Sequence, residues 1–247
     1  MKMSYLRQAL AVAMFLLALL PMPAAAADGN TNSGMKGDEA AVKVARGIVE
    51  AIGGKDVWAP MRSLYVRELV RAPWFDGLLA EEVWRDLEQP KERYEVVGDG
   101  LEMTRVWQSS GGWVNHSQRG FRTLTEKEIV ESEAFWPGDV YIMYHRLAKE
   151  DPLLSVALDE EGLLQISEDG LSRGWFQVNV TGEPIRWGLD TGAEAVEYVF
   201  GPLKAFGKIN FPAWGSATDA SWRYWYTDVI ASGEPVVFDT EPPTGAQ

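Results

Sequence analysis

The chain contains no cysteine and only two histidines, and these absences limit its chemistry. Without cysteine, no disulfide supports the fold, and no lipid can be attached to a cysteine behind an export signal. The two histidines, His116 and His145, are far apart in the sequence and have no cysteine beside them. Their spacing matches no common zinc-binding pattern, so a zinc site is not expected. We therefore expect no metal and no cofactor.

Basic residues are scarce relative to acidic ones, with 23 lysines and arginines against 36 aspartates and glutamates and a formal net charge of −13. This balance disfavours nucleic acid and anionic lipid surfaces as broad electrostatic partners. An acidic surface also keeps an exported domain soluble without implying any basic ligand. We expect no nucleic-acid partner.

Long apolar runs are absent except near the start, where Lys2 and Arg7 precede an apolar segment over 9–20. Pro21, Pro23 and the alanines of 24–27 follow it. Basic, apolar and small residues in this order are typical of a cleaved secretory signal, so we expect residues 1–27 to be removed and the mature protein to be periplasmic. Composition divides the remainder into a flexible leader over 28–37, a single domain over 38–240 and a flexible tail over 241–247.

The segment that follows the leader predicts a helix and then a strand. Asp38 is a natural N-cap, and apolar residues recur at helical spacing as far as Ile52. Gly53 and Gly54 then end the helix, because glycine adopts the left-handed conformation most easily. From Leu64 the period changes to two, which indicates a strand with one apolar and one solvated face.

Most of the remaining sequence alternates with period two between turn signals such as Gly98-Asp99-Gly100, which predicts a mainly β protein with an antiparallel meander. About eleven strands can form an incomplete antiparallel β-barrel wrapped around the N-terminal helix. The alternation lapses between 121 and 152. There Thr125 and Glu128 have the spacing of a capping box, and a second helix is expected over 139–149. We interpret this pair as a helical lid inserted into the sheet.

Motifs for catalysis are weak. Gly170-Leu171-Ser172-Arg173-Gly174 matches a hydrolase nucleophile elbow, but a strand follows it where that elbow needs a helix, so a hairpin turn is the better interpretation. Neighbouring carboxylates such as Glu81 and Glu82 face opposite sides of a strand and cannot form a facing acid–base pair. We expect no catalytic residue and no enzyme.

Eleven tryptophans are the unusual feature of the composition. They can fill a large core, line an apolar cavity, or serve as external stacking platforms for sugars. The second helix of the insertion favours the cavity, because its apolar stripe must cover something. The candidate ligand-binding residues of this cavity and lid are Phe135, Trp136, Val140, Met143, Tyr144, Leu147, Trp107, Phe176, Trp187 and Tyr198.

Several segments together resemble the LolA/LolB-like lipoprotein-carrier superfamily, in an uncharacterised exported branch. They are the N-terminal helix, Gly53-Gly54-Lys55-Asp56-Val57-Trp58, Met61-Arg62-Ser63-Leu64, the insertion over 125–149, and Gly207-Lys208-Ile209-Asn210-Phe211-Pro212. The resemblance implies a half-open barrel wrapped around a helix, with a helical lid over an apolar cavity.

It further implies a carrier that binds lipid or the acyl chain of a lipoprotein in transport or outer-membrane biogenesis, with an inner- or outer-membrane protein as a further candidate partner. The alternative is a non-enzymatic envelope interaction or sensor module in which the same cavity is only core.

Overall fold

The computed structural model describes residues 34–190, 195–238 and 241. The expected signal segment, residues 1–27, and almost all of the expected tail lie outside these ranges. The helices are α1 (Glu39–Ala51), α2 (Lys55–Trp58), α3 (Glu126–Phe135) and α4 (Val140–Ala148), and a short 3-10 turn, η1 (Trp136–Gly138), joins α3 to α4. Among the described residues no helix combines the length and apolarity needed to cross a membrane.

The strands run along the chain from an N-terminal pair of residues to the long C-terminal strand. They are β1 (Lys36–Gly37), β2 (Ser63–Arg71), β3 (Leu79–Asp86), β4 (Lys91–Gly98), β5 (Leu101–Gln108), β6 (Gly111–His116), β7 (Gly120–Thr123), β8 (Leu154–Leu158), β9 (Leu164–Glu168), β10 (Leu171–Val178), β11 (Pro184–Asp190), β12 (Ala195–Phe200), β13 (Leu203–Phe206), β14 (Ile209–Pro212), β15 (Trp214–Ala217) and β16 (Arg223–Ser232).

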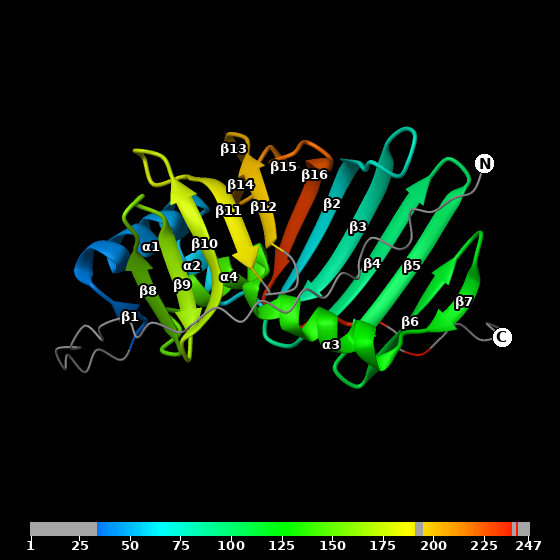
Figure 1. The fold of residues 1–247 in the computed structure, drawn as a ribbon, viewed down its shortest axis with the longest axis horizontal. Helices are drawn as coiled ribbons and strands as arrows, with labels where there is room; N and C mark the ends of the chain where they lie inside the picture. Colours follow the sequence, from blue (N-terminus) through cyan, green and yellow to red (C-terminus); the bar gives the residue numbers. More distant parts are fainter. Residues whose placement is uncertain (1–33, 191–194, 239–240, 242–247) are drawn as a thin grey trace, which may run out of the picture. The chain divides into compact units, whose positions relative to one another are not determined.

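Fourteen strands form one open sheet in the order β1-β8-β9-β10-β11-β12-β15-β16-β2-β3-β4-β5-β6-β7 (Figure 1). Among the described strands all pairings are antiparallel except β1 with β8, and the edge strands β1 and β7 do not pair with each other. The expected meander is confirmed over β2–β7 and β8–β12. The C-terminal strand β16 pairs with β2 and thereby joins the two meanders into one sheet.

The structure corrects the expected strand number. About eleven strands were expected from the turn signals, but turns also interrupt segments that the alternation predicts as single strands. The segment over 205–212 is an example. Gly207 adopts a left-handed conformation, with φ 64°, and folds this segment into the β13–β14 hairpin, which lies outside the main sheet.

The expectation of a flexible leader over 28–37 is wrong for its last two residues. Lys36 and Gly37 form β1 and pair in parallel with Ser155 and Val156 of β8. An edge strand presents unpaired N–H and C=O groups, and β1 satisfies some of those on β8. Gly37 permits the approach, because a Cβ there would lie 2.5 Å from the Val156 carbonyl oxygen.

Helix α1 forms as its sequence predicts. The Asp38 carboxylate accepts a hydrogen bond from the Ala41 N–H at 2.7 Å, and the apolar stripe of the helix is buried. Gly53 and Gly54 have φ values of 126° and 90°, which explains why the helix ends there. However, α1 packs against β8, β9 and α4. It therefore covers one half of the sheet only, and the sheet does not wrap around it as the sequence analysis expected.

Helix α4 is a core helix, which corrects the expectation of a lid. Its N-cap Asp139 and its span agree with the sequence prediction, but seven of its nine residues are buried. The ring of Tyr144 stacks on Phe176 at 5.4 Å between centroids and meets Trp58 edge-on at 5.5 Å. Helices α1 and α2 and the sheet pack around α4 on several sides. The single apolar stripe read from the sequence therefore predicted less burial of α4 than the structure shows.

Helix α3 is the outer member of the insertion. The capping box is present: the Thr125 hydroxyl accepts from the Glu128 N–H, and the Glu128 carboxylate accepts from the Thr125 N–H. Only Ile129 of this helix is buried, whereas Val130 is 55% exposed. Helix α3 therefore covers β3–β5 with far less apolar contact than α4 has in the core.

Candidate functional site

The structure divides the ten predicted site residues into two groups. One group lies in the hydrophobic core around α4 and on β10–β12, where Trp187 stacks on Tyr198 at 6.0 Å. Its members are Val140, Met143, Tyr144, Leu147, Phe176, Trp187 and Tyr198. The second group, Trp107, Phe135 and Trp136, borders a cavity between α3 and the sheet.

The core group leaves little reason to place a ligand beneath α4. Met143 is fully buried, Tyr144 and Leu147 are 1% exposed, and Phe176 is fully buried. Phe211 adds a further layer, because its ring stacks on Trp58 at 5.9 Å and on Tyr141 at 5.4 Å. Aromatic rings thus occupy the space that the sequence prediction assigned to an apolar chain.

The cavity beside α3 has a volume of about 290 Å³, near the lower end of the range of small-molecule sites. Strands β3–β5 supply one wall, and α3, η1 and the residue after η1 supply the other. The lining residues are Arg85, Glu92, Arg105, Trp107, Glu128, Glu131, Ser132, Phe135, Trp136 and Asp139. Aromatic and charged side chains therefore share one small space.

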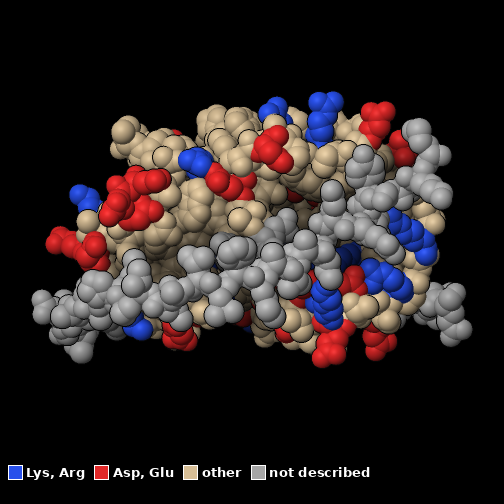
Figure 2. Space-filling model, in the orientation of Figure 1, with Lys and Arg blue, Asp and Glu red and all other residues tan. Residues whose placement is uncertain are grey.

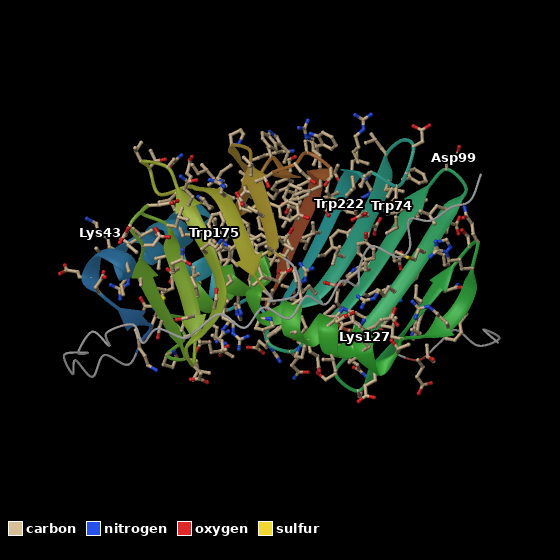
Figure 3. All side chains as sticks on the ribbon, viewed as in Figure 1. Lys43, Trp74, Asp99, Lys127, Trp175 and Trp222 are labelled. Carbon is tan, nitrogen blue, oxygen red and sulfur yellow. The ribbon has the colours of Figure 1, made fainter. Side chains whose placement is uncertain are left out.

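Strand register brings the sheet residues of this wall together. Arg85 of β3 pairs with Glu92 of β4, and Glu92 pairs with Trp107 of β5. Two residues further along β4, Tyr94 pairs with Arg105 of β5. Directly opposed residues on neighbouring strands point to the same face, so these side chains form adjacent rows on the face that α3 covers. Figure 3 labels Lys127 on α3, and Trp175 on β10 in the other half of the sheet.

Arg85 is well compensated. Its guanidinium lies 2.5 Å from the Glu92 carboxylate and 3.6 Å from that of Asp139, and it sits over the ring of Tyr141. Burial alone lowers the pKa of Arg85, but Asp139 and Glu92 together raise it above its ordinary value. Burial raises the pKa of Asp139, against the attraction of Arg85. This group ties η1 and the start of α4 to the sheet.

Arg105 has a different environment. Its Nη2 donates to the Ser132 hydroxyl of α3 at 2.7 Å, and its guanidinium carbon lies 6.0 Å from the centre of the Trp107 ring. Within the described part of the chain it forms no ion pair. Burial lowers the pKa of Arg105, and the more distant carboxylates of Glu92 and Glu128 do not restore it.

The sequence analysis considered Glu81 beside Glu82 but missed its partner across the strands, Glu68, on the same face of the sheet. Glu68 of β2 is directly opposite Glu81 of β3, and Glu81 is only 2% exposed. Burial raises the pKa of Glu68 to about 8, with a contribution from the charge of Glu81, and burial raises that of Glu81 to about 7. The signal was available, since Glu81 alternates with Leu79 and Val83 on the buried face of β3.

A second cavity, of about 320 Å³, lies on the other side of Trp136. Its charges are paired: Arg146 contacts Asp151 at 2.7 Å and Glu168 at 2.6 Å, and Arg173 contacts Glu168 at 2.9 Å. This network links α4 to β9 and β10. We interpret it as structural.

The Gly-x-Ser-x-Gly segment begins in a hairpin turn, as expected, and its last four residues belong to β10. Residues 169 and 170 form the turn between β9 and β10, and Leu171 pairs with Glu168. In the described ranges no group of histidine and carboxylate side chains is arranged to hold a metal ion. On the face shown in Figure 2, acidic and basic side chains are interspersed over the visible surface, so no single acidic patch dominates it.

No protein-family model matches the chain. No curated protein matches it in sequence. Among solved structures, a DUF1329 family protein from Desulfovibrio piger is similar, with a TM-score of 0.42 and 11% sequence identity, over 78% of this chain and 92% of that one. A likeness of this size indicates no function.

Proposed function

We propose that this protein is an exported, non-enzymatic binding protein that holds a lipid-like amphiphile, in the manner implied by its resemblance to LolA/LolB-type carriers. The cavity between α3 and strands β3–β5 is the binding site. The supporting observation is its lining, in which the rings of Trp107, Phe135 and Trp136 share one space with charged groups. Such a lining suits a molecule with an apolar chain and a polar end.

The attachment of α3 favours reversible entry. This helix buries only Ile129. Its side-chain links to the sheet lie at the rim of the helix: Arg122 of β7 binds Glu128 in the first turn, and Arg105 donates to Ser132. Segments with few buried apolar contacts open locally at low free energy, without unfolding of the whole domain. Helix α3 can therefore act as the cover that the sequence analysis assigned to the neighbouring helix.

The magnitudes are compatible with a carrier. Each methylene moved from water into an apolar site contributes roughly 0.8 kcal/mol, and a membrane offers nearly the same. A binding protein thus needs only a small net preference to collect and release its ligand. A cavity of about 290 Å³ accommodates the polar end and the first part of a chain, with the rest of the chain extending out of it.

Filling the cavity tests this proposal. Ser132→Phe places a ring inside the cavity, whereas Val130→Phe adds the same ring on the exposed side of the same helix. We expect the wild type and Val130→Phe to take up a fluorescent fatty acid and Ser132→Phe to lose at least tenfold in affinity. Uptake that is equal in all three proteins would contradict the assignment of the site.

The competing function is an envelope interaction or sensor module in which the aromatic interior is only core. The burial of seven of the nine residues of α4 is the observation that favours it. A wild type that takes up no apolar probe, and that shows no bound lipid by native mass spectrometry after purification, would support this alternative over the carrier.

Periplasmic localisation is part of the proposal and rests on the pattern over residues 1–27. Intact-mass measurement of the protein in a periplasmic extract should give a chain that begins near Asp28. A chain that begins at Met1 and is found in washed membranes would refute export with cleavage.

A further inference from the structure

The cavity wall contains an arginine, Arg105, that forms no ion pair with any described residue. The Arg105 guanidinium is held at the cavity wall by the Ser132 hydroxyl and lies beside the ring of Trp107. Guanidinium has five N–H donors in a planar fork, and one of its donors is used by Ser132. Arg105 is half-buried, and its remaining donors are not enclosed by the described residues, so they are open to an acceptor that enters the cavity.

Two other half-buried arginines in the described ranges are compensated by ion pairs. Arg85 contacts Glu92 and Asp139, and Arg146 contacts Asp151 and Glu168. In both cases the ion pairs outweigh burial and raise the pKa of the arginine. For Arg105 burial prevails and the pKa is lowered. Of these three arginines, Arg105 is therefore the one with no ion-pair partner of its own and the one that an added negative charge would pair.

Two further donors in the same wall lack partners. Arg85 Nη1 and Trp136 Nε1 are buried and have no hydrogen-bond acceptor within the described part of the chain. Both residues line the cavity together with Arg105. Buried donors in folded proteins are nearly always satisfied, so donors without acceptors that gather at one cavity indicate a ligand rich in acceptor oxygens.

The carboxylates of the lining are already engaged. Glu128 is bound by Arg122 at 2.7 Å, Glu92 by Arg85 at 2.5 Å, and Glu131 lies 3.6 Å from Lys127. They do not demand a cationic ligand. The net charge of −13 opposes an anion at long range, so recognition must come from contact inside the cavity.

We propose that Arg105 binds the anionic end of the ligand, an oxygen-rich group such as a carboxylate or phosphate that is attached to an apolar chain. This inference rests on the proposed function, because it names the ligand class of the same cavity. The rings of Trp107 and Phe135 contact the first part of the chain. On binding, the anion accepts hydrogen bonds from the guanidinium donors that Ser132 does not use.

Calorimetric titration of the full mature chain with three amphiphiles of equal chain length tests the proposal. The ligands are dodecanoate, dodecan-1-ol and dodecyltrimethylammonium, and acetate serves as an anion without a chain. A hydrogen bond between the guanidinium and a charged carboxylate should raise the affinity about tenfold or more over that of an uncharged ligand of equal chain length. We expect dodecanoate to bind at least tenfold more tightly than dodecan-1-ol.

Two substitutions identify the residue. Arg105→Gln should abolish the preference for dodecanoate while dodecan-1-ol still binds, and Arg105→Lys should restore part of it. Arg93→Gln is the matched control, because Arg93 lies on the opposite face of β4 and contacts Glu95. It removes the same charge from the same sheet and should leave the preference unchanged. Thermal unfolding of each variant checks that the sheet remains folded.

The outcomes separate the two levels of the proposal. Equal binding of dodecanoate and dodecan-1-ol by the wild type, or tightest binding of dodecyltrimethylammonium, would overturn the role of Arg105 and leave the amphiphile site standing. Acetate that binds as tightly as dodecanoate would support the anion site and overturn the carrier. Absence of binding by every amphiphile would overturn both.

Discussion

Glu68 of β2 and Glu81 of β3 lie directly opposite each other on the buried face of the sheet, and one carboxylate oxygen of each is buried without a hydrogen-bond partner in the described part of the chain. Like charges at opposed positions of neighbouring strands destabilise a sheet. Arg85 lowers the pKa of Glu68, and the Tyr94 hydroxyl lowers that of Glu81, but burial prevails at both. The pair therefore favours protonated carboxyls near neutral pH.

The first prediction concerns the pH dependence of stability. In the folded state the pKa of Glu68 is about 8 and that of Glu81 about 7, above the ordinary value of 4.5. Between pH 4.5 and 8 the unfolded chain binds fewer protons than the folded chain, so the free energy of unfolding falls as pH rises through this window. Below it, both states are protonated and the effect vanishes.

Glu68→Gln should flatten this fall and should stabilise the protein at pH 8 more than at pH 5. Glu102→Gln, on an exposed position of β5, is the control and should leave the slope unchanged. Urea titrations at several pH values measure both. A Glu68→Gln variant with the slope of the wild type would show that this pair is ionised in the folded protein.

The second prediction separates a core helix from a lid. Met143→Glu places a carboxylate among fully buried apolar side chains of α4, which costs several kcal/mol, comparable to the whole stability of a domain. We expect loss of the folded state by far-ultraviolet dichroism. Val130→Glu, on the exposed side of α3, should change the free energy of unfolding by less than about 0.5 kcal/mol. A folded Met143→Glu protein that had lost only ligand binding would restore the lid interpretation of α4.

The third prediction concerns the capping box of α3. Thr125→Ala removes the acceptor for the Glu128 N–H and should weaken the helix end by about 1 kcal/mol, which corresponds to about fivefold faster amide exchange in α3. Exchange in β8–β11 should not change. Thr123→Ala, two residues earlier and also exposed, serves as the control. Faster exchange throughout the sheet would show that α3 does not open independently.

The fourth prediction uses two glycines in and after α1. Gly47→Ala should stabilise the protein by roughly 0.5–1 kcal/mol, since the position is helical and an added Cβ meets nothing within 4 Å. Gly53→Ala should destabilise it, because φ there is 126° and the Cβ would lie 2.6 Å from the Lys208 carbonyl oxygen. Thermal unfolding of the two variants compares them directly. Equal effects would contradict this backbone geometry.

The site was only partly predictable from the sequence. Trp107, Phe135 and Trp136 were identified because wide aromatic side chains on a strand and near a helical insertion are candidates for a cavity wall. Arg85 and Arg105 were missed, since a charged residue on a strand is ordinarily solvated. Only the register of β3–β5 and the position of α3 show that these arginines are enclosed.

Local signals in the sequence determined the mainly β class, the span of α1, the glycines that end it, the capping box of α3 and the Asp139 start of α4. These features depend on side chains within a few residues of one another, so periodicity and capping chemistry are enough to find them. The opposition of Glu68 and Glu81, the contact of Arg105 with Ser132 and the burial of α4 on nearly all sides involve segments brought together by folding. Their burial and charge balance are set by neighbours distant in the chain, and only the tertiary structure decided them.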